Sequence, residues 1–186
     1  PPHPRPWLLA SGGKDGSLAL WCPTAPPDVP GGSLAPLATS PTAHAGPLTA
    51  LALARRAAGA WVVTGGEDRM LRLWDTAAAA VAAAAAAAGA AAPSPPLPLT
   101  STAGTLAHDK AINAVDVSPD DGLAVSASAD RTARLWRLPD LVPGPVLRGH
   151  RRGVWDARFA PADRLVATAG GDAVIRLWAL PDGACV

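Results

Sequence analysis

The chain has 186 residues, a formal net charge of +1 and 17% charged residues. Its 16 basic residues balance 15 acidic ones, so a nucleic-acid binder that works through net charge is excluded and any basic recognition must be local. The 21 Pro and 18 Gly residues favour many short elements joined by turns, which excludes a coiled coil.

The chain ends and the two cysteines narrow the class of protein further. Cys22 and Cys185 have neither metal-ligand spacing nor a disulfide framework, which favours a reducing compartment such as the cytosol or nucleus. No stretch has the layout of a signal peptide, and the apolar run 77–92 is nearly pure alanine, too weakly hydrophobic for a membrane span. We expect no cofactor, metal ion, membrane contact or small-molecule substrate. The first residue is Pro and the last few begin a new apolar segment, which predicts a fragment of a longer protein.

Four segments of the chain superimpose without gaps. In each, a hydroxyl residue stands four positions before an Asp, and a Trp stands six positions after it. A His precedes each of the last three Asp residues by 22 to 24 positions. The sets are Ser11, Asp15 and Trp21; His44, Thr64, Asp68 and Trp74; His108, Ser126, Asp130 and Trp136; and His150, Thr168, Asp172 and Trp178. A repeat of this kind governs the fold.

The repeats predict short strands arranged as hairpins, because apolar runs are punctuated by small residues and Asp. In chain order, the expected strands are 8–11, 18–21, 48–53, 61–64, 71–74, 112–117, 123–126, 132–136, 154–159, 165–168 and 174–178. Trp136 and Trp178 are 42 residues apart, within the roughly 40 to 45 residues of a four-stranded propeller blade. The predicted fold is all-β, with about four blades of an incomplete, seven-bladed propeller.

The strand after each His departs from strict alternation. Its most apolar residues stand four, seven and nine positions after the His, as in Val154, Ala157 and Phe159. The odd step predicts a bulge that swings the residue five after the His outward. The residues at that position are Thr49, Asn113 and Trp155. The Trp155 side chain is therefore either buried in the core or exposed to solvent, and the sequence does not decide between the two.

The longest connection lies between Trp74 and His108. Its alanine run has the propensity for a transient helix, but Gly89 and the Pro-rich stretch 93–98 favour a mobile linker, which we expect. The predicted organisation is a partial repeat at 7–40, complete repeats at 44–76 and 108–147, a repeat truncated at its outer strand at 150–186, and an Ala- and Pro-rich insertion at 77–105.

The repeated residues resemble those of the WD40 family. In that family the His, the Ser or Thr, the Asp and the Trp form a side-chain hydrogen-bond network within each blade, so the resemblance implies a structural role for all four sets. Only Trp74 is followed by the Asp that gives the family its name, Asp75.

From His108 onward the resemblance is narrower. Residues 149–155, Gly-His-Arg-Arg-Gly-Val-Trp, and the run 175–185 are similar to the second propeller of a WD40 family in the small-subunit processome, the U3 small nucleolar RNP assembly that matures pre-18S rRNA. The resemblance implies a non-catalytic nucleolar scaffold in small ribosomal subunit biogenesis. Its partners would be protein subunits of that assembly, with contact to pre-rRNA or snoRNA left open. The alternative is a WD40 adaptor in signalling or a substrate receptor of a ubiquitin ligase.

Ser, His and Asp together also fit a hydrolase triad. Here the same set recurs in each of the three repeats that contain the His, with Thr replacing Ser twice and a Trp always added. That pattern favours a network that satisfies buried polar groups. We therefore expect no catalytic residue.

The His loops and Asp turns of a propeller project to one face, where basic residues of this chain, Arg69 among them, are expected to gather. Such a rim is suited to RNA phosphates or an acidic protein segment. Arg151, Arg152 and Trp155 are favoured as a set because an aromatic beside two Arg resembles an interaction hot spot. The candidate partner-binding residues are Lys110, Arg131, Arg148, Arg151, Arg152 and Trp155.

Overall fold

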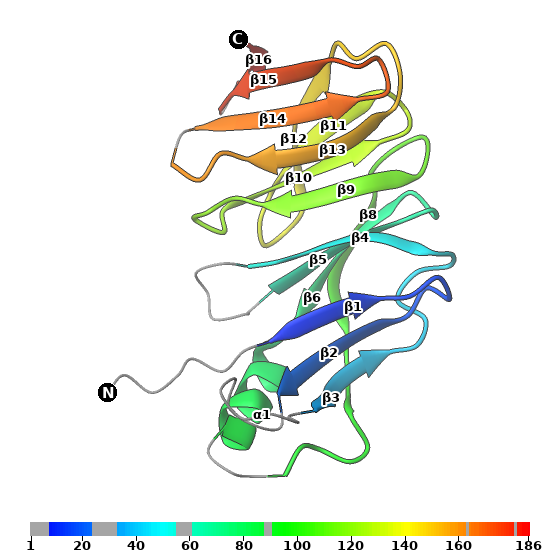
Figure 1. Cartoon of the computed structure of the whole chain (residues 1–186), viewed down its shortest axis with the longest axis vertical. Helices are drawn as coiled ribbons and strands as arrows, with labels where there is room; N and C mark the ends of the chain where they lie inside the picture. Colours follow the sequence, from blue (N-terminus) through cyan, green and yellow to red (C-terminus); the bar gives the residue numbers. More distant parts are fainter. Residues whose placement is uncertain (1–7, 24–32, 55–60, 88–90, 163, 181) are drawn as a thin grey trace.

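A computed structural model of the chain describes residues 8–23, 33–54, 61–87, 91–162, 164–180 and 182–186. In this part of the chain, strands form four sheets of four strands each, accompanied by one helix (Figure 1). The first sheet has the order β1 (Leu9–Gly12), β2 (Leu18–Pro23), β3 (Leu34–Ser40) and β7 (Leu97–Pro98). The second has the order β4 (Leu48–Leu53), β5 (Trp61–Gly66), β6 (Met70–Asp75) and β8 (Ser101–Leu106).

The third and fourth sheets are each continuous in sequence. The third sheet contains β9 (Ile112–Val117), β10 (Leu123–Ser128), β11 (Thr132–Arg137) and β12 (Val142–Arg148). The fourth contains β13 (Val154–Phe159), β14 (Leu165–Gly170), β15 (Ile175–Ala179) and β16 (Ala184–Cys185). Each predicted strand has a counterpart, and the prediction of an all-β fold built from WD40 blades is confirmed. Residue 7 and residues 24–32 of the predicted partial repeat lie outside the described residues.

The sheets stack face to face, as Figure 1 shows, and the core lies between them. Val125 and Leu135 of the third sheet pack in one cluster with Val154 and Trp178 of the fourth. Side chains alternate across a strand, so every inner sheet contributes apolar residues to both of its neighbours. The repeated Trp thus anchors each complete repeat to the preceding sheet.

The predicted bulges are confirmed in all three inner strands. Between β4 and β5 the register shifts between Leu48 and Ala50, and between β13 and β14 it shifts between Val154 and Asp156. Between β9 and β10, Ser128 pairs with Ile112 but Ala127 pairs with Ala114. The extra residue is therefore Thr49, Asn113 or Trp155, each five positions after its His.

The alanine run forms a packed helix, so the prediction of a mobile linker is wrong for this segment. Helix α1 (Ala77–Ala87) lies against β2 and β3. Ala79 and Ala83 are buried in one cluster with Leu20, Cys22 and Leu37. Alanine has the highest helix propensity, and its small side chain lets the helix approach the sheet closely. Gly89, on which the linker prediction rested, lies outside the described residues.

The rest of the insertion supplies strands to two sheets. Strand β7 pairs in parallel with β3 at the outer edge of the first sheet, where Ala38 is opposite Leu97. Strand β8 then pairs with β6 and completes the second sheet, although most of it falls within the range assigned to the insertion. The described residues include no strand beside the free edge of β1.

The outer face of the fourth sheet remains uncovered. Ile175 and Leu177 are 74% and 44% exposed, whereas Leu71 and Leu73, at the same positions of the second sheet, are 0% and 1% exposed. The fourth sheet therefore presents an apolar face that its counterparts bury. No helix in the described part of the chain is long and apolar enough to cross a membrane.

Candidate functional site

The third repeat shows the side-chain network in full. His108 Nδ1 lies 2.9 Å from an Asp130 carboxylate oxygen, and His108 Nε2 lies 2.8 Å from Ser126 Oγ. Trp136 donates its indole N–H to the same Ser126 oxygen over 2.8 Å. His108 and Ser126 are 2% and 0% exposed, so the hydroxyl joins two ring nitrogens inside the protein.

The second and fourth repeats repeat this geometry with Thr in place of Ser. His44 bonds Asp68 at 2.9 Å and Thr64 at 2.7 Å, and His150 bonds Asp172 at 2.9 Å and Thr168 at 2.8 Å. Trp74 and Trp178 each donate to the Thr hydroxyl oxygen over 2.8 Å. The structure thus brings all twelve of these predicted residues together in three separate sets.

The partners fix where the protons lie. An ionised Asp only accepts hydrogen bonds, so His Nδ1 carries the proton that it donates to the carboxylate. Neutral His Nε2 then accepts, and the Ser or Thr hydroxyl donates to it while accepting from the indole. Every polar atom in this relay is satisfied, which is what burial of polar groups requires.

The titration behaviour agrees with this assignment. Burial lowers the pKa of His108 below its ordinary value, against the opposing attraction of Asp130. Burial raises the pKa of Asp130, but hydrogen bonds from Thr132 and His108 outweigh this and bring it to about 2. The backbone N–H of Arg151 and the ring of His150 lower the pKa of Asp172 to about 2. Desolvation is likewise outweighed at Asp68, whose pKa falls because His44 and the backbone N–H of Met70 donate to it.

The network has the connectivity of a hydrolase triad but not its accessibility. A nucleophile must be reachable by substrate and face an oxyanion hole. Ser126 and Thr64 are 0% exposed, and each hydroxyl oxygen already accepts an indole N–H. The arrangement stabilises the blade and offers no room for a reacting group at the hydroxyl.

The first repeat forms only part of the network. Trp21 donates to Ser11 Oγ over 2.8 Å, yet Ser11 is exposed. Asp15 accepts hydrogen bonds from the backbone and the hydroxyl of Ser17, which lower its pKa. No hydrogen bond from a His in the described residues reaches Asp15.

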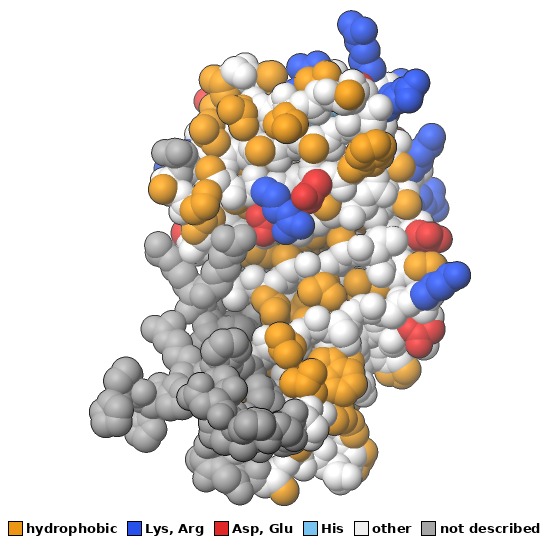
Figure 2. Space-filling model, viewed as in Figure 1, with side chains coloured by type: hydrophobic (Ala, Val, Ile, Leu, Met, Phe, Trp, Pro, Cys, Tyr) orange, Lys and Arg blue, Asp and Glu red, His pale blue; other side chains and the backbone are white. Residues whose placement is uncertain are grey.

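The His loops and the Asp turns lie along one edge of the molecule, where Lys and Arg side chains gather (Figure 2). Between the third and fourth sheets this edge is hollowed over about 500 Å³. Four of the six predicted partner-binding residues line that hollow, namely Lys110, Arg131, Arg151 and Arg152. We call this hollow, which these four cationic residues help to line, the basic hollow.

The other two predicted residues lie outside the basic hollow. Trp155 is 67% exposed and its ring lies beside Gly171 and Arg152. Arg148 is the last residue of β12, exposed, and paired in register with Thr132. Trp155 thus neighbours Arg152 but lines a separate hollow with Thr49 and Asn113, and Arg148 lies apart from the basic hollow.

The bulge residues connect one sheet to the next, a role that sequence reasoning missed. Thr49 donates its hydroxyl to the carbonyl of Ile112, and Asn113 donates its amide to the carbonyl of Val154 over 2.7 Å. Ile112 and Val154 are each four positions after a His. In both cases, therefore, the bulge residue of one sheet bonds the carbonyl at the same position of the next sheet. The sequence contained a sign of this role, because Thr49 and Asn113, both able to donate a hydrogen bond, each stand five positions after a His.

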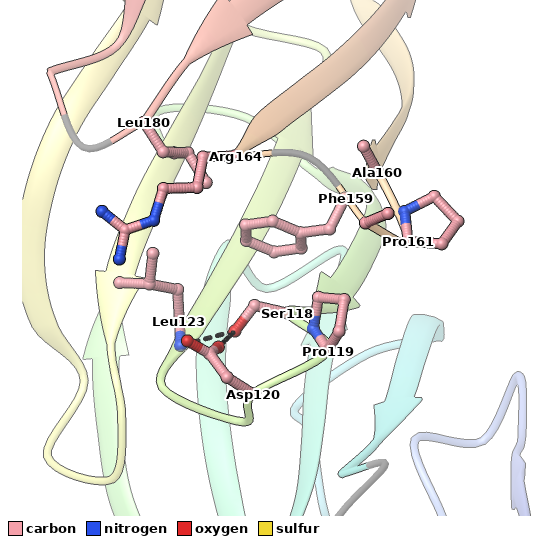
Figure 3. A pocket seen from close by; sticks show the side chains of 10 residues that line it. Ser118, Pro119, Asp120, Leu123, Phe159, Ala160, Pro161, Arg164 and Leu180 are labelled. Atoms are coloured by element: carbon pink, nitrogen blue, oxygen red, sulfur yellow. Dashed lines mark hydrogen bonds between the residues drawn. The ribbon is translucent and has the colours of Figure 1, made fainter.

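A second hollow, of about 280 Å³, lies at the opposite edge between the same two sheets (Figure 3). Phe159, Leu123 and Leu180 give it apolar walls, and Arg164 stands at its side. Ser118 bonds Asp120 within the turn over 2.6 Å. Sequence reasoning missed this hollow too, although Pro119 and Pro161 occupy equivalent positions in its two turns.

The model of the family described as "WD domain, G-beta repeat" matches residues 36–75, 100–137 and 142–179. Each match begins in or just before a strand of one sheet and runs through three strands of the next, as residues 142–179 do from β12 to β15. These matches cover more than half of the chain, and the fold agrees with them. The chain belongs to the WD40 repeat family.

Among curated proteins, the chain is similar to transducin beta-like protein 3 of Mus musculus, with 37% identity over 153 residues, or 82% of this chain. The Homo sapiens protein of that name is 34% identical over 149 residues, 80% of this chain. U3 small nucleolar RNA-associated protein 13 of Saccharomyces cerevisiae is 44% identical over 50 residues, 27% of this chain and 6% of its own length. The match spans 18% of the mouse protein and 17% of the human one.

Proposed function

We propose that this chain is part of a non-catalytic scaffold of the U3 small nucleolar RNP, the small-subunit processome, and acts in pre-rRNA processing in the nucleolus. The observation that carries the proposal is the 37% identity to transducin beta-like protein 3 across 82% of the chain. The link to U3 comes from the 44% identical stretch of 50 residues shared with a U3 small nucleolar RNA-associated protein.

The geometry supports a scaffold because the repeated polar residues face inward. Thr64, Ser126 and Thr168 are buried and bonded within their own blades. Recognition is therefore left to the exposed surface, which includes the turns and loops that commonly carry binding. Partners would be protein subunits of the assembly.

Affinity purification of the tagged protein from cell extract tests the proposal. We expect U3 snoRNA and processome proteins to be recovered. Recovery of a cullin and its adaptor in their place would indicate a ubiquitin-ligase substrate receptor and overturn the proposal. Recovery of signalling proteins alone would also contradict it.

A further inference from the structure

The basic hollow concentrates cations from two sheets. Lys110 and Arg131 belong to loops of the third sheet, and Arg151 and Arg152 come from the loop that leads into β13. All four are exposed. The acidic residues in the lining are Asp109 and Asp130. The four cations already outnumber these two carboxylates. Asp130 also accepts hydrogen bonds from His108 and Thr132, so its negative charge is partly engaged within the blade.

The loops that carry these cations are held in place from below. Asp130 accepts the backbone N–H of Asp109 over 3.2 Å, and Asp172 accepts the backbone N–H of Arg151 over 2.9 Å. The backbone N–H of Gly171 donates to the carbonyl of Gly153 over 2.8 Å. A site fixed in this way loses little conformational entropy when a ligand binds.

Trp155 adds an aromatic surface beside the basic hollow. A Cβ placed on Gly171 would lie 3.1 Å from the Trp155 ring and 3.4 Å from Arg152 Cβ. The ring therefore rests on a glycine next to Arg152. Because 67% of Trp155 is exposed, the ring presents free aromatic surface to solvent.

We propose that this surface binds single-stranded RNA, with phosphates in the basic hollow and an unpaired base stacked on Trp155. Arginine forks match phosphate oxygens, and an exposed aromatic ring stacks on any base. An acidic peptide would use the cations but leave Trp155 without a role, and duplex RNA offers no unstacked base. The inference rests on the proposed function, since it assigns this part of the scaffold an RNA contact.

Arg69 supplies a matched control for Arg131. Both residues follow the Asp of a hairpin turn, and both have left-handed backbone conformations, with φ of 68° and 73°. Arg69 lies outside the basic hollow. Replacing either by Gly removes one charge and relieves the same backbone strain, so only the place of the charge differs.

The test measures binding of fluorescein-labelled oligouridine to the intact chain by anisotropy. We expect Arg131→Gly to weaken binding about tenfold, the equivalent of one charge-assisted contact, and Arg69→Gly to leave it unchanged. Salt dependence provides a second readout, because each lost phosphate contact reduces the slope of log K against log salt by about 0.7. Equal losses from both variants would overturn the proposal by showing that only overall charge matters.

Trp155→Leu separates stacking from charge. It should weaken binding of oligouridine and leave binding of an abasic oligonucleotide of equal length unchanged, because the latter has phosphates without bases. If Trp155→Leu affects neither ligand, the stacking half of the proposal is wrong. If an oligoglutamate peptide binds more tightly than oligouridine and depends on Arg131, the surface recognises an acidic protein segment.

The scaffold function and the RNA inference can be tested separately, because recovery of processome proteins and binding of oligouridine are different measurements. The Arg131→Gly and Trp155→Leu variants, tagged and purified from cells, should still recover processome proteins through other surfaces if the scaffold role holds. Loss of RNA binding with intact recovery supports both statements. Failure of the unmodified chain to bind oligouridine overturns the RNA inference alone.

Discussion

Each buried hydroxyl of the repeated network serves two rings at once. Removing Ser126 Oγ leaves the Trp136 indole N–H and the His108 Nε2 without a partner in a site closed to water. Unsatisfied buried groups cost more than the bond itself contributes. The same indole bond in the first repeat, from Trp21 to Ser11, lies at an exposed serine.

This contrast gives the first prediction. Ser126→Ala should lower the free energy of unfolding by about 2–3 kcal/mol, whereas Ser11→Ala should lower it by less than about 1 kcal/mol. Urea denaturation followed by tryptophan fluorescence measures both. Equal effects would mean that burial of the hydroxyl contributes nothing.

The second prediction concerns pH. Burial lowers the pKa of His108 below its ordinary 6.5, so the folded chain binds this proton less readily than the unfolded chain. The stability from neutral His108 is fully present above about pH 6.5 and is lost as pH falls toward the folded-state pKa. Thermal unfolding between pH 7 and about pH 5 should show this loss. His108→Gln, which has no titrating ring, should show a shallower slope.

Further acidification acts on the carboxylates. Asp130 and Asp172 have pKa values of about 2 in the folded chain, below the ordinary 3.8. Their stabilisation is present above about pH 4 and disappears as pH falls toward 2.

The third prediction uses the left-handed turn residues. Arg69 and Arg131 have positive φ where the first repeat has Gly16, with φ of 78°. A side chain in this conformation carries strain that glycine avoids. Arg69→Gly should raise the free energy of unfolding by about 0.5–1 kcal/mol. Arg137→Gly, in a strand with ordinary φ, should lower it in the same urea titration.

At the scale of elements, α1 provides the fourth prediction. Ala83 is 2% exposed against the first sheet, while Val81 on the same helix is 71% exposed. Ala83→Lys would force a charge into the apolar cluster and should destabilise the chain by about 3 kcal/mol. Val81→Lys should change stability by less than about 0.5 kcal/mol. Similar effects of the two variants would show that the helix does not pack as described.

The strands and bulges could be predicted because their signals are local and repeated. The apolar spacing after His150 locates both the strand and the displaced Trp155. The packing of α1 could not be predicted in this way, because a run of alanine has no amphipathic pattern to mark a buried face. Its buried positions, Ala79 and Ala83, depend on a sheet formed by residues far earlier in the chain.

The candidate surface was predictable only in part. The repeat placed Lys110 and Arg131 on the same edge as Arg151, since loops at equivalent positions share a face. That these side chains line one hollow depends on the distance between the third and fourth sheets. The spacing of residues along the sequence does not contain that distance. Arg148 carries the same charge but ends a strand outside the hollow. The hollow around Phe159 combines residues of two turns and was missed for the same reason.

At the scale of the whole molecule, the uncovered face of the fourth sheet governs solution behaviour. Ile175 and Leu177 are exposed where equivalent residues are buried between sheets. We predict that this chain, produced by itself, self-associates through that face. Ile175→Thr combined with Leu177→Thr should reduce association in sedimentation velocity. Val81→Thr, which removes an exposed valine elsewhere, should not.

The path of the chain between the first two sheets couples these sheets to each other. After β6 the chain crosses to the first sheet to add β7, and only then returns to place β8 at the edge of the second. The first two sheets therefore share the stretch of chain between β6 and β8, whereas the third and fourth sheets are each built from consecutive strands. In native-state hydrogen exchange, β3 and β8 should open together as one cooperative unit, with β11 and β12 opening independently of them.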